Sequence, residues 1–175
     1  LQLMNIRDTS IDEATYLRVI RSKTAKLFEA SARLAPILVD TDAATEDACA
    51  TYGQALGTAF QVIDDILDYE GNATELGKNL GDDLREGKIT LPIICALRTG
   101  SAAQQALIRQ SIQKGNADHL HDIQQIIVET GALTTARASA QAEVKRAINA
   151  AEALPANEHR RALLQLAADL MERRS

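Results

Sequence analysis

The sequence predicts an all-α protein, and composition and periodicity both indicate this. Alanine and leucine dominate while aromatic residues make up 3% and tryptophan is absent, which suits packed helices better than a β-sandwich. Apolar residues recur at helical intervals along most of the chain. With 46% apolar residues among 175, the chain can build the core of one domain.

A long helix is expected near the start of the chain. Ser10 and Glu13 have the spacing of a capping box, and the apolar pattern that follows continues as far as Val39. Pro36 lies within this pattern and lacks a backbone donor. The helix should therefore kink or end about one turn before the pattern does.

A second long helix should run from near Thr45 to a stop at Gly71. Gly53 and Gly57 lie four residues apart inside it, where each glycine costs roughly 1 kcal/mol relative to alanine. Such a pair indicates close helix packing or close approach of a ligand, and we favour packing.

The remaining chain is expected to form a loop followed by shorter helices. Residues 71–88 combine four glycines with many charges and no sustained periodicity, which predicts a loop with at most a short helical turn. Thr90, with Pro92 at an early helical position, opens a helix that ends at Gly100. Further amphipathic helices are expected over residues 101–114, 118–130, 132–153 and 157–173.

Charge and hydropathy exclude several classes of partner. A net charge of -5 gives no electrostatic footprint for nucleic acid or an anionic membrane surface. No apolar run reaches the roughly 20 residues of a transmembrane helix, and no signal-peptide pattern is present. Cys49 and Cys95 lack metal-ligand spacing and are expected to be buried free thiols, in agreement with a cytoplasmic protein.

Acidic residues cluster on one face of the second long helix. At about 100° per residue, a polar arc and a separate apolar arc form, with Gln61, Asp64, Asp65 and Asp68 on the first and Phe60, Ile63 and Leu67 on the second. Neighbouring like charges favour a counter-cation, and magnesium is usually held by one or two carboxylates together with phosphate oxygens. The alternative is a solvated acidic face.

The surroundings of the aspartates resemble the trans-isoprenyl diphosphate synthase family. Its second aspartate-rich motif, F-Q-x-x-D-D-x-x-D, matches Phe60 to Asp68, and its later G-K, G-D-D and G-K elements match Gly77-Lys78, Gly81-Asp82-Asp83 and Gly87-Lys88. Upstream, Lys23-Thr24 also matches. The resemblance extends through the chain and is closest to bacterial octaprenyl diphosphate synthases.

The resemblance implies an isoprenoid synthase-type helical bundle of which only the C-terminal portion is present. Residues 1–175 would form that portion of a single domain, since the family's first aspartate-rich motif, neighbouring arginines and Gly-Gly-Lys-Arg isopentenyl diphosphate site have no counterpart. The opening residues 1–4 read like the inside of a helix, so an upstream portion is expected. The complete enzyme would be a homodimer.

By resemblance, the aspartates would bind Mg²⁺. Asp64 and Asp68 would hold magnesium that bridges to the allylic diphosphate, with Asp65 assisting directly or through water. Lys23 would contact the same diphosphate, or else be one of several surface lysines.

Other positions match substrate-facing residues of the family. The oxygens of Thr24 and Gln61 would face the reacting allylic carbon, where dipoles can stabilise positive charge; helix-to-helix hydrogen bonding is the alternative. Lys78 and Lys88 would bind diphosphate on the loop after the motif, or else carry solvent-exposed charges. Asp82 and Asp83 match the family's acidic turn.

The three histidines are assigned no site. His119 and His121 would point about 200° apart on a helix and have no evident acidic or cysteine partner, while His159 is expected on the surface.

The expected function is that of a polyprenyl diphosphate synthase, a prenyltransferase that condenses an allylic diphosphate with isopentenyl diphosphate, as for a quinone side chain. The 175-residue chain alone should lack synthase activity. One alternative is a non-catalytic helical subunit or interaction module with this fold, and another is a class I terpene or squalene synthase-like enzyme.

Overall fold

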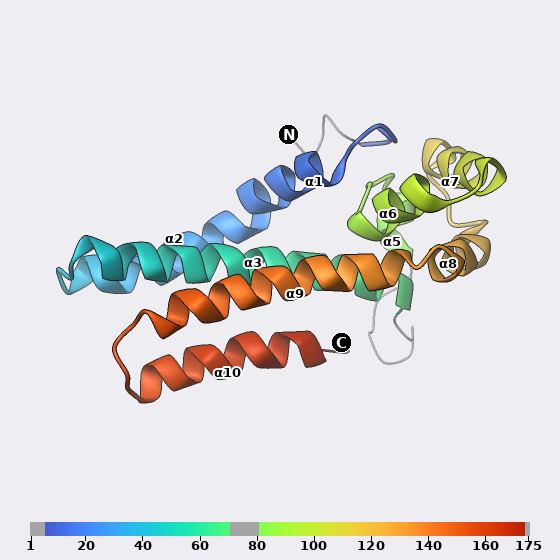
Figure 1. Cartoon of the computed structure of the whole chain (residues 1–175). Coiled ribbons are helices and arrows are strands. Elements are labelled where there is room, and N and C mark those ends of the chain that lie inside the picture. Colours follow the sequence, from blue (N-terminus) through green and yellow to red (C-terminus); the bar gives the residue numbers. More distant parts are fainter. Residues whose placement is uncertain (1–5, 71–80, 174–175) are drawn as a thin grey trace. The chain divides into compact units, whose positions relative to one another are not determined.

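A computed structural model describes residues 6–70 and 81–173, and every regular element within these ranges is a helix (Figure 1). The all-α prediction is therefore confirmed. The helices are α1 (Glu13–Ile20), η2 (Arg21–Ala25), α2 (Lys26–Leu38), α3 (Ala43–Glu70), α5 (Asp82–Arg85), α6 (Leu91–Thr99), α7 (Ala102–Lys114), α8 (Leu120–Glu129), α9 (Ala132–Glu152) and α10 (Glu158–Glu172).

The first predicted helix begins later than its capping-box pattern suggested. Asp12 caps it instead of Ser10, because the Asp12 carboxylate accepts from the Thr15 backbone N–H at 2.8 Å. Ser10 is engaged elsewhere, since its backbone N–H and its hydroxyl both donate to Asp8. An aspartate at this position satisfies one of the unpaired N–H groups of the first turn.

The same predicted helix is interrupted by a feature that the apolar pattern did not indicate. Residues Arg21–Ala25 form the π-helical segment η2, between α1 and α2. The helix does not end a turn early at Pro36, as one of the two expectations for this residue had it, because α2 continues past this buried proline to Leu38. The backbone N–H of Thr41 donates to the Pro36 carbonyl at 3.1 Å, so the carbonyl of the proline itself is satisfied.

The later boundaries agree closely with the sequence. Helix α3 begins after Asp42, whose carboxylate accepts from the Thr45 backbone N–H at 2.8 Å, and it ends at Glu70, one residue before the predicted stop. Ser101 forms a capping box at the start of α7, and Asn157 caps α10. The first ten residues of the predicted loop, 71–80, lie outside the described residues, and α5 supplies the short helical turn after them.

The chain divides into two compact units. Within the described residues, the first unit comprises 6–19, 64–70 and 81–138, and the second comprises 20–63 and 139–173. In the first unit α6 packs against α7 and α8, and α5 packs against α7. Its fully buried side chains are mostly branched aliphatics, among them Ile66, Leu84, Leu91, Ile93, Ile108, Ile112, Ile123 and Ile127.

The second unit is built around the adjacent parts of α3, α9 and α10, which run side by side in Figure 1. Its core is rich in small residues, with Tyr52, Ala55, Leu56 and Ala59 of α3 against Val144, Ala147 and Ala151 of α9 and Ala167 of α10. Small side chains let helix backbones approach closely, so dispersion contacts accumulate over the length of the helices.

The two glycines of α3 lie where α3 meets η2 and α2, as the packing interpretation predicted. A Cβ atom on Gly53 would lie 2.4 Å from the Phe28 carbonyl oxygen, and one on Gly57 would lie 2.7 Å from the Ala25 Cα atom. No side chain fits at either position without movement of the neighbouring backbone. The glycines therefore set the distance between α3 and the segment that carries Lys23 and Thr24.

None of the helices in the described part of the chain is long and apolar enough to cross a membrane. Cys95 is buried as expected, while Cys49 is only partly buried.

Candidate active site

The three aspartates of the F-Q-x-x-D-D-x-x-D sequence occupy the last turns of α3, within the first unit, but their environments differ. Asp64 and Asp68 are partly buried, and Asp65 is 5% exposed. Asp64 and Asp68 are four residues apart and so lie on one face of the helix. The motif therefore contains two carboxylates with access to solvent and one inside the unit.

Asp65 is held by Tyr16 of α1. The buried Tyr16 hydroxyl donates to Asp65 Oδ2 at 2.5 Å, which is the length of a strong bond to a charged acceptor. Burial raises the pKa of Tyr16 well above its ordinary value, and the negative charge of Asp65 raises it further. Tyr16 therefore stays protonated, and it joins α1 to the end of α3.

Asp68 is bonded to the turn that opens α5. Its side-chain Oδ2 accepts from the Asp83 backbone N–H at 3.2 Å, and its carbonyl accepts from the Gly81 backbone N–H at 3.2 Å. Burial raises the pKa of Asp68 to about 6, and the nearby negative charge of Asp83 contributes in the same direction. The Gly81-Asp82-Asp83 sequence thus brings further acidic groups beside the motif.

The basic residues near α5 are paired with acidic residues of the same segment. Lys88 Nζ lies 3.0 Å from Asp83 Oδ1 and 2.7 Å from Glu86 Oε2, and Arg85 lies 2.5 Å from Asp82. Burial acts to lower the pKa of Lys88, but its bonds with Glu86 and Asp83 outweigh this and place the pKa above the usual value. Lys78, the other predicted diphosphate ligand on this loop, lies outside the described residues.

The donor set fits a hard divalent cation held by two carboxylates. Oxygen ligands are what magnesium prefers, and it usually takes only one or two from protein carboxylates. Burial is the main cause of the raised pKa of Asp68, the negative charges of Asp83 and Asp82 add to it, and a bound cation would favour the charged carboxylate. Among the described residues, no group of three or more His, Cys, Asp or Glu side chains is arranged to hold a metal ion. Asp64 and Asp68 are suited to bind a magnesium ion, whereas Asp65 Oδ2 is occupied by its buried hydrogen bond to Tyr16.

In the second unit, Thr24 and Gln61 are bonded to each other, which is the helix-to-helix hydrogen bonding named as the alternative to a substrate-facing role. Thr24 Oγ1 of η2 donates to Gln61 Oε1 of α3 at 2.8 Å. A hydroxyl that donates its hydrogen this way directs its lone pairs elsewhere, so it can still face a cationic centre. Lys23 lies one residue earlier in η2 and is exposed.

A second set of contacts fixes the π-helical segment. Arg21 Nη2 lies 2.6 Å from Glu143 Oε1 of α9, and the Glu143 side chain is 11% exposed. Arg146 Nε lies 3.0 Å from the other oxygen of Glu143 and its Nη2 donates to Gln54 of α3 at 2.9 Å. The first residue of η2, Arg21, is thus bonded to α9, and α9 is in turn bonded to α3. π-Helical turns are frequent at functional sites.

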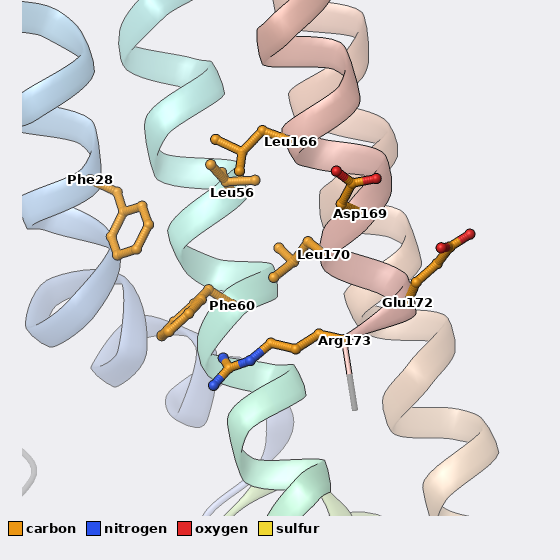
Figure 2. Close-up of a pocket in the computed structure, with 8 residues that line it drawn as sticks. All are labelled: Phe28, Leu56, Phe60, Leu166, Asp169, Leu170, Glu172 and Arg173. Atoms are coloured by element: carbon orange, nitrogen blue, oxygen red, sulfur yellow. The ribbon is translucent and has the colours of Figure 1, made fainter. Parts of the chain in front are cut away.

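An apolar pocket of about 520 Å³ lies within the second unit (Figure 2). Its walls come from three helices, with Phe28 of α2, Leu56 and Phe60 of α3, and Leu166 and Leu170 of α10, and the polar residues Asp169, Glu172 and Arg173 complete its lining. Figure 2 shows Arg173 reaching from the end of α10 over Phe60, and its guanidinium carbon is 4.8 Å from the ring centroid.

Two contacts, one at a predicted site residue and one in the segment that carries Lys23 and Thr24, were not found from the sequence. Tyr16 is 49 residues from Asp65, and Glu143 is 122 residues from Arg21, so no local spacing indicates either pair. The expectation that His119 has no acidic partner was wrong, because its Nδ1 lies 3.1 Å from Asp122. This exposed pair joins neighbouring turns at the start of α8, and two side chains alone do not indicate a metal site. His159 is exposed, as predicted.

Comparison with known proteins gives consistent results. The sequence model of a family described as Polyprenyl synthetase matches residues 1–130. Octaprenyl diphosphate synthase from Haemophilus influenzae is 47% identical over 167 residues, which covers 95% of this chain and 51% of that protein. The enzyme of the same name from Escherichia coli is 46% identical over 168 residues, and this match covers 95% of our chain and 52% of that enzyme.

Solved structures agree with the sequence comparison. A polyprenyl synthase from Caulobacter crescentus, solved with calcium and isoprenyl diphosphate, superposes with a TM-score of 0.93 at 36% identity. The superposition covers 99% of this chain and 54% of that one. The chain thus spans about half the length of the relatives it matches.

Proposed function

This chain belongs to the polyprenyl synthetase family, and from that premise we propose that it supplies the metal-binding and allylic diphosphate-binding half of a trans-polyprenyl diphosphate synthase. The reaction is condensation of an allylic diphosphate with isopentenyl diphosphate, which lengthens a polyprenyl chain such as the side chain of a quinone. The observation that carries the proposal is the pair of partly buried carboxylates, Asp64 and Asp68, on one face at the end of α3.

In this proposal Asp64 and Asp68 hold magnesium, and Asp65 positions the helix that carries them. Bound magnesium acts as a Lewis acid on the diphosphate leaving group. The Tyr16 hydroxyl holds Asp65 at 2.5 Å, so the last turns of α3 stay fixed against α1. Asp65 then supports the site without being a direct ligand. Of the two roles expected from the sequence, binding magnesium directly or through water, we therefore do not propose the direct one.

Thr24 and Gln61 face the carbon at which the reaction occurs. The bond from C1 of the allylic substrate to its diphosphate oxygen breaks with its electron pair, the isopentenyl double bond attacks C1, and a proton then leaves the new chain. Positive charge develops at C1 in this sequence. The oxygens of Thr24 and Gln61, ordered by their 2.8 Å hydrogen bond, stabilise that charge without having to reorganise.

The lysines bind the diphosphate groups. Lys23 is exposed on η2, where a flexible ammonium group can follow a mobile phosphate. Lys88 is paired with Asp83 and Glu86 and exchanges these partners for a diphosphate when substrate binds. Lys78, which lies outside the described residues, is assigned the same role from the sequence resemblance alone. The complete synthase is a cytoplasmic homodimer.

The test is a single-chain fusion in which this chain follows the part of Haemophilus influenzae octaprenyl diphosphate synthase that the match does not cover. Incorporation of labelled isopentenyl diphosphate into prenyl diphosphate is measured with and without magnesium. We expect magnesium-dependent transfer, a fall of roughly 100-fold or more in kcat for Asp64→Ala because a ligand of the cation is lost, and a normal rate for Asp47→Ala, an exposed aspartate earlier on α3.

Three results would contradict the proposal. Near-normal turnover by Asp64→Ala would remove the metal role of this residue. Vigorous transfer by the 175-residue chain alone would show that the remaining half is not needed. A fusion that folds and takes up magnesium but transfers no isoprenoid would favour a non-catalytic helical module.

A further inference from the structure

Lys23 and Thr24 lie inside the segment η2, whose five residues are π-helical. π-Helical turns are rare and mostly occur as single turns within α-helices. Return of η2 to α-helical bonding would shift the register by one residue, which is a rotation of about 100° about the helix axis. The direction of the Lys23 side chain therefore depends on the contacts that keep η2 π-helical.

The first residue of η2 is held by a charged group of α9. Arg21 Nη2 lies 2.6 Å from Glu143 Oε1, and Arg146 Nε makes an ion contact of 3.0 Å with Glu143 Oε2. The Glu143 side chain is 11% exposed, and its Oε2 atom and the Nε atoms of both arginines are shielded from solvent. Charges shielded in this way attract one another more strongly than charges in water. One carboxylate thus binds two guanidinium groups and fixes the start of η2.

The same set of bonds continues through α3 to the residue that follows η2. Arg146 Nη2 donates to Gln54 Oε1 at 2.9 Å, and Gln54 Nε2 donates to Glu29 Oε2 of α2 at 3.2 Å. The Gln54 amide uses its oxygen toward one partner and its nitrogen toward the other, so its orientation is determined. Lys26 Nζ lies 2.7 Å from Glu29 Oε1. We call this set of residues the η2 network; its members are Arg21, Glu143, Arg146, Gln54, Glu29 and Lys26.

The η2 network brackets the two residues of η2 that the proposed function assigns to the substrate. Its ends, Arg21 and Lys26, lie two residues before Lys23 and two residues after Thr24. All of its members belong to the second unit. Buried ion pairs add little net stability, because desolvation of the charges offsets their attraction, and their best supported role is to fix register. Such a network is therefore better suited to hold η2 in one geometry than to stabilise the fold.

We propose that the ion pair of Arg21 with Glu143 positions the substrate-binding residues of η2. The pair holds η2 in its π-helical form, so that Lys23 reaches the allylic diphosphate and Thr24 stays bonded to Gln61. This inference rests on the proposed function, because the direction of Lys23 matters to the reaction only if Lys23 binds substrate. It adds two positioning residues that touch neither substrate nor metal, and they are 122 residues apart in the chain.

Kinetics of the fusion described above test the role of Arg21. Arg21→Met keeps the bulk of the side chain and removes its charge, while Glu143 retains Arg146 as a partner, so no unpaired buried charge is left. We expect the KM for the allylic diphosphate to rise about fivefold or more, because Lys23 is displaced from the diphosphate. The KM for isopentenyl diphosphate should stay within about twofold, because η2 does not bind that substrate.

Arg33→Met is the matched control. It removes an ion pair of the same kind, in which Arg33 Nε lies 2.7 Å from Glu46 Oε1. This pair also joins α2 to α3 but is not part of the η2 network. Both KM values should therefore be unchanged in Arg33→Met.

A double-mutant cycle shows whether Arg21 acts through Lys23. Lys23→Ala alone should raise the KM for the allylic diphosphate about tenfold or more, because a charged contact with the diphosphate is lost. If Arg21 only positions Lys23, Arg21→Met should add less than about twofold in the Lys23→Ala background. Arg21→Lys should restore most of the affinity, since a single Nη2 atom makes the 2.6 Å contact with Glu143 and an ammonium group can replace it.

Hydrogen exchange measures the hold on η2 independently of catalysis. The backbone amides of residues 21–26 should exchange at least about tenfold faster in Arg21→Met than in the parent fusion, because η2 then opens locally. The same amides should be unchanged in Arg33→Met. Circular dichroism checks that each variant folds.

The outcomes separate the positioning role from the function. An unchanged KM for the allylic diphosphate in Arg21→Met, within a fusion that transfers isoprenoid, overturns the positioning role and leaves the function intact. Equal rises in the KM of both substrates, full additivity with Lys23→Ala, or a KM for Arg21→Lys as high as that for Arg21→Met also overturn it. A parent fusion without transferase activity refutes the proposed function, and hydrogen exchange then decides by itself whether Arg21 holds η2.

Discussion

Replacement of Gly57 by alanine tests whether the contact between α3 and η2 is as close as the structure shows. In an open helix this change stabilises a protein by about 1 kcal/mol, because glycine has the greater backbone entropy to lose. At Gly57, however, the new Cβ atom would lie 2.7 Å from Ala25 Cα and 2.8 Å from Phe28 Cγ. The Ala25 contact is with backbone, which cannot rotate away as the end of a long side chain can.

The helices must therefore separate by several tenths of an ångström. Overpacking of this kind costs about 1–3 kcal/mol, so after subtraction of the propensity gain we expect Gly57→Ala to lower the free energy of unfolding by up to about 2 kcal/mol. Ala25 adjoins Thr24, so the displacement should also stretch the hydrogen bond from Thr24 to Gln61. In the fusion, kcat should fall more than KM rises.

Urea unfolding followed by circular dichroism measures the change in stability, with Gly131→Ala as the matched control. A Cβ atom on Gly131 would have no other atom within 4 Å, but the φ of this residue is 67°, so its replacement reports backbone strain of about 1–2 kcal/mol without crowding. A gain in stability of about 1 kcal/mol for Gly57→Ala, the value for an open helix, would refute the close contact.

Three further changes probe the site. Tyr16→Phe should lower the free energy of unfolding in urea by about 1.5–3 kcal/mol, because the buried Asp65 carboxylate loses a hydrogen bond to a charged group. The control Tyr52→Phe loses a bond to a neutral carbonyl and should cost about 1 kcal/mol. Equal losses for the two variants would argue against a charged Asp65. Burial raises the pKa of Asp68 to about 6, so the free energy of unfolding without metal should fall as pH rises through about 6. Over the same range the magnesium affinity measured by calorimetry should rise, because the carboxylate becomes charged. Asp68→Asn should flatten both pH profiles. Lys23→Ala should raise KM for the allylic diphosphate in the fusion and leave the circular dichroism spectrum unchanged; an unaltered KM would count against contact with the substrate.

Helix positions could be predicted from the sequence because local signals determine them. The α7, α9 and α10 boundaries follow Ser101, Gly131 and Asn157, which are capping or positive-φ residues recognisable in isolation. The π-helical segment could not be predicted in this way. Its fixed contacts, from Arg21 to Glu143 and from Thr24 to Gln61, span 122 and 37 residues, so they depend on how the chain folds back on itself.

The polarity of α2 shows a second limit of reasoning from periodicity. The apolar pattern correctly predicted a helix there, but it did not say which face is inside. The ordinary assumption places leucines inward, whereas Glu29 and Arg33 face α3 and Leu34 and Leu38 face outward. The direction is set by polar partners on α3, Gln54 and Glu46, which no local pattern in α2 contains.

The aspartate-rich motif itself illustrates how a shared helical face can divide into different roles. The sequence places all three carboxylates within one arc of about 100°, but Asp65 lies toward the edge of that arc, where α1 packs against α3. A carboxylate buried there without a donor would be destabilising, so Tyr16 is required as its partner. Asp64 and Asp68 remain on the accessible part of the face. In the proposed function, a motif of three aspartates would thus provide two positions for a cation, while Asp65 anchors the helix. This anchor could be recognised only when its partner, 49 residues away, was located.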